Sequence, residues 1–129
     1  MIYIIDTYGW IEYFKGSKKG EIVEKIINNN KNKTITLECC IAEIMLYCLR
    51  NNFEFSRALH LIKTNSYVFP VSIDTWLDAA RIKFEIRKNR PGFGIIDAIL
   101  ISKQKENKAK IVSGDSHFKG LKGIVYIGE

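Results

Sequence analysis

The chain of 129 residues, 47% of them hydrophobic, is long enough for one compact domain with its own core and too short for two. Its net charge of +6 favours polyanionic partners, although a basic surface that only keeps the protein soluble would give the same value. No segment approaches the ~18 consecutive apolar residues of a membrane span, and the apolar run before Asp6 is too short for a signal peptide, so we expect a cytoplasmic protein without membrane contact.

The first half of the chain alternates short apolar runs with helical patterns. Residues 2–5 predict a strand, and Asp6 with Thr7 provides the N-cap chemistry for the helix that follows. Residues 15–20 interpose a turn rich in glycine and lysine. The further elements expected in this half are a helix over residues 21–29, a strand over 34–37, helices over 38–50 and 53–63, and a strand over 67–69.

The second half continues the alternation. Ser72 predicts the N-cap of a helix that runs to about Lys88, before Pro91 and Gly92 interrupt the pattern. The remaining elements expected are a helix over residues 94–106, a strand over 110–112, a helical turn over 115–118 and a strand over 124–127. Strands that alternate with helices, and that are apolar enough for burial on both faces, predict an α/β fold: one domain over residues 1–129, arranged as a three-layer α/β/α sandwich with a mostly parallel sheet.

Four acidic residues stand alone inside or directly after apolar runs: Asp6, Glu43, Asp97 and Asp115. Because an ionised carboxylate taken out of water costs several kcal/mol unless a cation or hydrogen-bond donors compensate it, this placement indicates a shared cation. Asp6 and Asp115 each follow a strand, at the edge of a parallel sheet where ligands gather. N-capping of the next helix is the alternative for either residue alone, and one side chain can do both.

Glu43 and Asp97 lie on helices that are apolar nearly all round, and such helices are normally buried. Each is the only charged residue in its segment, residues 41–49 and 93–101, so the alternative of a buried ion pair finds no matching cation there. Oxygen-only ligands suit a hard divalent ion, Mg²⁺ or Mn²⁺. Together with a basic exterior, they predict metal-assisted hydrolysis of phosphodiester bonds, in which the metal activates a water molecule.

At these residues the chain resembles the PIN-domain ribonucleases and, within them, the VapC-type toxins of prokaryotic toxin–antitoxin pairs. The resemblance runs through most of the chain and is carried by residues 4–14, 36–44, 95–100 and 111–118, each of which holds one of the isolated acids. It implies a parallel sheet of about five strands. It also implies an endoribonuclease that depends on Mg²⁺ or Mn²⁺ and acts as the toxin of a type II toxin–antitoxin pair.

The resemblance further implies a role for each acid. Asp6 and Asp97 would be the principal metal ligands, while Glu43 and Asp115 would complete the catalytic cluster and help to orient water. The implied partners are RNA, a small antitoxin protein whose tail occupies the site, and a second copy of the chain in a homodimer. The alternative is a non-catalytic PIN-fold module that binds RNA or a regulatory partner, and the presence of all these acids argues against it.

Several other polar residues can be placed around this cluster. By resemblance, Thr7 and Ser113 would support it by hydrogen bonds. The basic residues best suited to RNA contact are Arg81, Lys83, Arg87, Lys88 and Arg90, with Lys103, Lys105, Lys108 and Lys110 as a second group. Such charge runs are also typical of a solvated helix face. His60 and His117 are interpreted as surface or packing residues. The cysteines are odd in number and outside any C-x-x-C pair, so core packing is expected for Cys39, Cys40 and Cys48.

Overall fold

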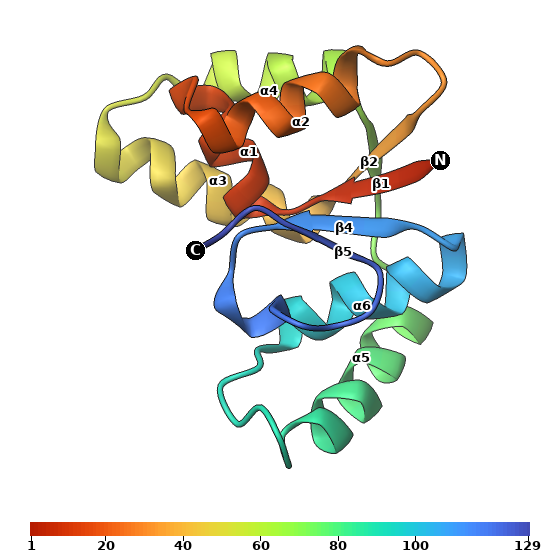
Figure 1. Ribbon diagram of the computed structural model, residues 1–129. Coiled ribbons are helices and arrows are strands. Elements are labelled where there is room, and N and C mark those ends of the chain that lie inside the picture. Colours follow the sequence, from red (N-terminus) through yellow and green to blue (C-terminus); the bar gives the residue numbers. More distant parts are fainter.

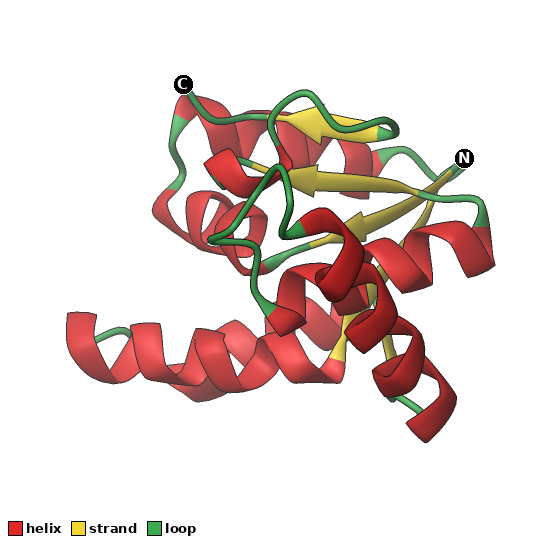
Figure 2. Cartoon of the chain, turned by 90° about the horizontal axis from the view of Figure 1, so that it is seen from below, coloured by secondary structure: helices red, strands yellow, loops and turns green.

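The computed structural model describes residues 1–129 and contains one five-stranded sheet in the order β3-β2-β1-β4-β5. Every neighbouring pair of strands is parallel, and Figure 2 shows the strands pointing the same way. The strands are β1 (Ile2–Ile5), β2 (Lys33–Leu37), β3 (Tyr67–Phe69), β4 (Lys110–Ser113) and β5 (Ile124–Tyr126). The predicted sheet of about five strands is confirmed, and it is parallel throughout.

Helices cover both faces of this sheet (Figure 1). One face carries α1 (Thr7–Lys15), α2 (Lys18–Asn28), α3 (Glu38–Asn51) and α4 (Phe55–Asn65), and the other carries α5 (Ile73–Ile86) and α6 (Ile95–Asn107). A short 3-10 turn, η1 (Ser116–Phe118), follows β4. This arrangement confirms the predicted three-layer α/β/α sandwich.

The two layers of core follow from the two-residue period of the strands. Ile4 of β1 and Ile111 of β4 pack toward α5 and α6, whereas their neighbours Ile5 and Val112 pack toward α1 to α4. All of these side chains are fully buried. A strand that is buried on both faces typically has a continuous run of apolar residues, and β1 and β4 both have such a run in the sequence.

The order of the strands places the candidate site. From β1 the chain adds β2 and β3 on one side and later places β4 and β5 on the other, so the direction of winding changes between β1 and β4. In open α/β sheets, such a switch point leaves a crevice outside the carboxyl ends of the strands. The register pairs Ile5 with Val112, which brings Asp6 and Ser113 to the same level at this edge.

The prediction that the helix holding Glu43 is buried all round is wrong. α3 buries Cys40, Ile44 and Cys48 but exposes Glu43 together with an apolar stripe made of Met45, Leu46 and Leu49. Nothing within the chain covers this second apolar face. The core role expected for the cysteines is confirmed, since Cys40 and Cys48 are buried and Cys39 is half-buried, and all three thiols are free.

α5 has an uncovered apolar stripe as well. Ile73, Trp76, Leu77 and Phe84 expose 76, 41, 51 and 57% of their surface, so this helix contacts α6 with only part of its apolar surface. None of the helices in the structure combines the length and the apolar content that crossing a bilayer requires.

Candidate metal centre

The four isolated acids line one pocket of about 230 Å³ at the switch point of the sheet. They reach it from different elements: Asp6 from the end of β1, Glu43 from α3, Asp97 from α6 and Asp115 from the end of β4. The other lining residues are Thr7, Tyr8, Ile11, Ile96 and Leu100. The fold therefore brings together all four acids that the sequence singled out.

Asp6 is the most deeply buried of the four, with only 5% of its surface exposed. Its Oδ1 accepts a hydrogen bond of 2.8 Å from the backbone N–H of Gly9, so Asp6 is also the N-cap of α1. Burial, together with the charges of Asp115 and Asp97, raises the pKa of Asp6 to about 7, although hydrogen bonds from Ser113 and Gly9 act in the opposite direction. A cation in this pocket would remove that penalty by favouring the ionised carboxylate.

Asp97 stands in the first turn of α6, where its carboxylate helps to start the helix. Its Oδ2 accepts a hydrogen bond of 2.9 Å from the backbone N–H of Gly94. This explains how a residue with poor helix propensity is tolerated here, because a carboxylate in the first turn meets unpaired backbone donors and the positive end of the helix dipole. The side chain is 16% exposed, so the carboxylate is largely shielded from solvent.

Asp115 is the N-cap of the η1 turn, and its side chain is more exposed than that of Asp97. Its Oδ1 accepts a hydrogen bond of 2.9 Å from the backbone N–H of His117, and its side chain is 40% exposed. The backbone N–H of Asp115 donates to Oγ of Ser113 over 3.0 Å. Ser113, which is fully buried, thus contacts both Asp6 and Asp115 from below the pocket.

Glu43 lies on the exposed side of the pocket. The hydroxyl of Thr7 donates to Oε1 of Glu43 over 2.7 Å, which links the first turn of α1 to α3. The supporting hydrogen bonds anticipated for Thr7 and Ser113 thus have partners inside the acidic cluster, although the catalytic roles of these residues stay predictions.

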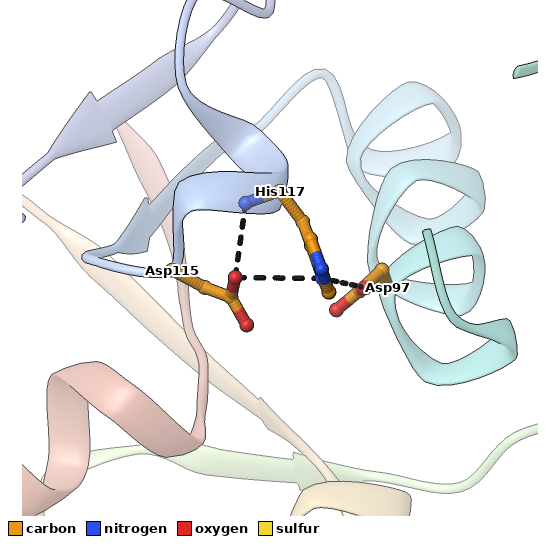
Figure 3. A group of neighbouring side chains, drawn as sticks. All are labelled: Asp97, Asp115 and His117. Atoms are coloured by element: carbon orange, nitrogen blue, oxygen red, sulfur yellow. Dashed lines mark hydrogen bonds and ion pairs between the residues drawn. The ribbon is translucent and has the colours of Figure 1, made fainter. Parts of the chain in front are cut away.

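His117, interpreted from the sequence as a surface or packing residue, is 41% exposed and packs beside Phe93, but it also contacts the acidic cluster, which the sequence analysis did not predict. Its ring lies between Asp97 and Asp115 (Figure 3), with Nδ1 2.9 Å from Oδ2 of Asp97 and 3.4 Å from Oδ1 of Asp115. One signal was available: His117 stands two residues after an acid at a strand end, within a turn that this acid caps. Such a turn folds back across the edge of the sheet.

Tyr8 forms another part of the pocket wall that the sequence did not indicate. Its ring lies against the backbone of Gly114, where a Cβ atom would collide with it. The Tyr8 hydroxyl accepts a hydrogen bond of 2.9 Å from Nζ of Lys19, which itself lies 3.6 Å from a carboxylate oxygen of Glu129. The ammonium group of Lys19 therefore lies behind the Tyr8 ring, which forms one wall of the acidic pocket.

The basic residues proposed for RNA contact do not line the pocket. Most are on the open surface of α5 and its continuation, where Arg87 stacks on the ring of Phe84 and Lys88 pairs with Glu85. Arg90 is engaged differently, because its guanidinium donates to the backbone carbonyls of His117 and Lys119 over 2.9 and 2.7 Å. Arg90 thus fixes the η1 segment, while RNA binding by this group stays a prediction.

The donor set fits a hard divalent cation. The pocket gathers four carboxylates, and ligand atoms of Asp97, Asp115 and His117 lie within 4.8 Å of one another. Carboxylate oxygens are the donors that Mg²⁺ and Mn²⁺ prefer, and the buried carboxylate of Asp6 has no lysine or arginine partner among the lining residues.

Comparison with known proteins agrees with this architecture. A sequence model described as PIN domain matches residues 3–124. A toxin–antitoxin complex from Klebsiella pneumoniae has a similar structure at 17% identity, with a TM-score of 0.70 and 98% of each chain covered. VapC20 of Mycobacterium tuberculosis, described as a sarcin–ricin loop cleaving toxin, is 13% identical with a TM-score of 0.74, over 94% of this chain and 95% of that one.

A third similar structure is VapBC2 from Rickettsia felis, determined with a DNA fragment from its promoter. It is 16% identical with a TM-score of 0.73, and the match covers 98% of this chain and 97% of that one. No curated protein sequence matches the chain. At these identities the similar structures establish a shared fold, and the sequence match to the PIN domain covers nearly the whole chain.

Proposed function

Because the chain belongs to the PIN domain family, we propose that it is a divalent-metal-dependent endoribonuclease and the toxin of a type II toxin–antitoxin pair. The observation that carries the proposal is the convergence of Asp6, Glu43, Asp97 and Asp115 on one pocket at the switch point of the sheet. Burying part of such a charge cluster costs free energy, which a bound cation would offset. The net charge of +6, which already includes the four carboxylates of this cluster, suits a polyanionic substrate.

The environments of the acids suggest a division of roles. Asp6 and Asp97, the most buried pair, are suited to be the principal ligands of Mg²⁺ or Mn²⁺. When bound, such an ion supplies positive charge against the phosphate oxygens and makes water a stronger nucleophile. Asp115 completes the cluster at the open side. Glu43, whose Oε1 accepts a hydrogen bond from Thr7, would accept a further hydrogen bond from the attacking water.

The partners proposed are a small antitoxin protein and a second copy of the chain. Similar structures described as toxin–antitoxin complexes support the first. The uncovered stripes on α3 and α5 support both, because contiguous exposed apolar side chains on a soluble protein indicate protein interfaces. An antitoxin segment that reached the pocket would bring a cation to the acidic cluster in place of the metal.

The test is cleavage of total cellular RNA by purified, antitoxin-free protein, with Mn²⁺ and with EDTA. We expect discrete fragments only with Mn²⁺. The Asp97→Asn variant should lose at least 100-fold in rate, because it removes one principal ligand. Glu24→Gln is the matched control, since Glu24 is an exposed carboxylate on α2, outside the pocket, and it should cleave as the wild type does.

Two results would contradict the proposal. Cleavage that persists in EDTA or in Asp97→Asn would place the activity elsewhere or in a contaminant. Well-folded wild-type protein that cleaves no RNA with Mn²⁺ or Mg²⁺ would favour the non-catalytic PIN-fold module that binds RNA or a regulatory partner.

A further inference from the structure

We propose that His117 is a positioning residue, which holds the Asp97 carboxylate from outside the pocket so that Oδ1 faces the metal site. The proposal rests on the proposed function, since it concerns how the same acidic pocket is prepared for a divalent cation. It assigns to His117 a hydrogen-bonding role and not a place among the metal ligands.

The hydrogen bonds of Asp97 distinguish its two oxygens. Oδ2 accepts from the backbone N–H of Gly94 and lies 2.9 Å from Nδ1 of His117, so two groups occupy this one oxygen. A carboxylate oxygen has two lone pairs, which these two partners satisfy. Oδ1 is therefore the oxygen that is left for a cation.

The position of His117 separates it from the ligands. The residues lining the pocket include Asp97 and Asp115 but not His117, whose side chain is 41% exposed. Figure 3 shows the imidazole beside the two carboxylates, where it bridges α6 and the end of β4. Because an ionised carboxylate can only accept a hydrogen bond, we assign the imidazole proton to Nδ1, which then donates to Oδ2 of Asp97 and is itself not available to a metal.

The surroundings of His117 are built to hold this orientation. Its backbone N–H donates to Oδ1 of Asp115, and its backbone carbonyl accepts from the guanidinium of Arg90 over 2.9 Å. Its ring packs beside Phe93, with the ring centroids 6.3 Å apart. Phe93 is 1% exposed and belongs to the core under α6, so the imidazole rests on a rigid part of the fold.

The expected consequence lies in metal affinity. Groups that hydrogen-bond to metal ligands fix the ligand orientation, and their loss typically weakens metal binding by about 10- to 100-fold. His117→Ala should therefore raise the Kd for Mn²⁺ by about this factor. His117→Asn keeps an N–H donor close to the position of Nδ1 and should recover most of the affinity, whereas His117→Phe keeps the ring without the donor and should behave as His117→Ala does.

The experiment is a Mn²⁺ titration at pH 8, followed by the electron paramagnetic resonance of free Mn²⁺. The proteins compared are the wild type, the three His117 variants and the matched control His60→Ala, which removes an exposed histidine on α4. Circular dichroism verifies folding, and His117→Phe keeps the comparison informative if His117→Ala is unfolded. Affinity that follows the donor, with an unaffected His60→Ala, supports the proposal.

Two results would overturn it. One is a Kd for Mn²⁺ in His117→Phe equal to that of the wild type. The other is a nitrogen coupling in the electron spin echo of bound Mn²⁺ that disappears in His117→Asn, because it would make His117 a ligand. Wild-type protein that binds Mn²⁺ but cuts no RNA contradicts the nuclease and leaves the histidine comparison valid, whereas wild-type protein without Mn²⁺ binding contradicts both.

Discussion

The carboxylate of Asp6 has two roles, because it is the N-cap of α1 and also lines the acidic pocket. N-capping uses only Oδ1 as an acceptor, so the same carboxylate can also contribute to the pocket. The cost of the arrangement is burial, which raises the pKa of Asp6 to about 7. We expect the buried Asp6 carboxylate to lower the free energy of unfolding of the metal-free protein, and a bound cation to raise it again. Substitution of Asp6 therefore tests both effects.

The pH dependence of stability follows from that pKa. Asp6 has an ordinary pKa of 3.8 in the unfolded chain and about 7 in the fold, so between these values the folded state keeps a proton that the unfolded state has lost. The free energy of unfolding therefore falls as pH rises from about 4 to about 7 and then levels off. Asp6→Asn removes this loss and still caps α1, so at pH 8 in EDTA it should unfold with a free energy higher by on the order of 3 kcal/mol.

Urea denaturation of the wild type and Asp6→Asn at pH 4 and pH 8 measures this difference, which should nearly vanish at pH 4. Saturating Mn²⁺ should cancel most of this difference at pH 8, because the cation stabilises only a protein that binds it: a concentration of 100 times Kd contributes about 2.7 kcal/mol. If Asp6→Asn is instead less stable than the wild type at pH 8 in EDTA, the carboxylate is compensated inside the protein and no cation is needed.

Among the elements, the packing of α1 against α2 depends on one glycine. Ser17 caps α2 by accepting a hydrogen bond of 3.0 Å from the N–H of Gly20, so this helix begins at Lys18 and includes a glycine that the sequence analysis assigned to a turn. A Cβ atom on Gly20 would collide with the backbone carbonyl of Glu12 in α1. Because backbone cannot move aside as a side chain can, the two helices need this glycine to pack at their present distance.

Gly20→Ala should therefore destabilise the protein, although alanine ordinarily favours a helix by about 1 kcal/mol over glycine. Displacing α1 from α2 should lower the free energy of unfolding by about 1–3 kcal/mol, the usual range for overpacking. Urea denaturation provides the measurement, with Glu24→Ala as a control at an exposed position of the same helix. An equal or higher stability for Gly20→Ala would mean that the helices separate freely and that α1 is not held in place by α2.

The same elements show how far the sequence could predict the structure. Strand and helix order followed from the periods of apolar residues, because the central strands β1 and β4 are buried on both faces and the helices pack apolar side chains on the sheet. The start of α2 at Lys18 could not be predicted from these periods, because Gly20 becomes a packing residue only through its contact with the neighbouring helix α1. The carboxylates of the site could be predicted since an isolated charge in an apolar run is unusual. For His117 the only signal was its place two residues after Asp115, which does not show that the η1 turn places the imidazole against α6.

At the scale of the whole molecule, the sequence could not show that α3 and α5 expose apolar side chains, because nothing within the chain covers these faces. An apolar helix face was expected to be buried inside the domain, yet Met45, Leu46 and Leu49 face outward. An apolar helix face has the same sequence pattern whether it is buried against another molecule or inside its own domain. The apolar composition therefore indicates assembly as well as a core.

The charges of α5 suggest how a second copy would associate. Its first half carries Asp74 and Asp78, and its second half and the residues that follow carry Arg81, Lys83, Arg87 and Lys88, with Glu85 among them. In a twofold-symmetric dimer the same surface meets itself, and two antiparallel copies of α5 would place acidic halves against basic halves. The apolar stripe of Ile73, Trp76 and Leu77 would then be covered by its counterpart.

We therefore expect a homodimer that Leu77→Asp converts to a monomer, because it would bury two unpaired carboxylates in the interface. Light scattering after size exclusion should give twice the mass of 14.9 kDa for the wild type and 14.9 kDa for the variant. Ile22→Asp, a similar change at an exposed position of α2, should stay dimeric. A wild-type protein that is monomeric at micromolar concentration, or a Leu77→Asp variant that remains dimeric, would leave the α5 stripe to another partner, for which the antitoxin is then the candidate.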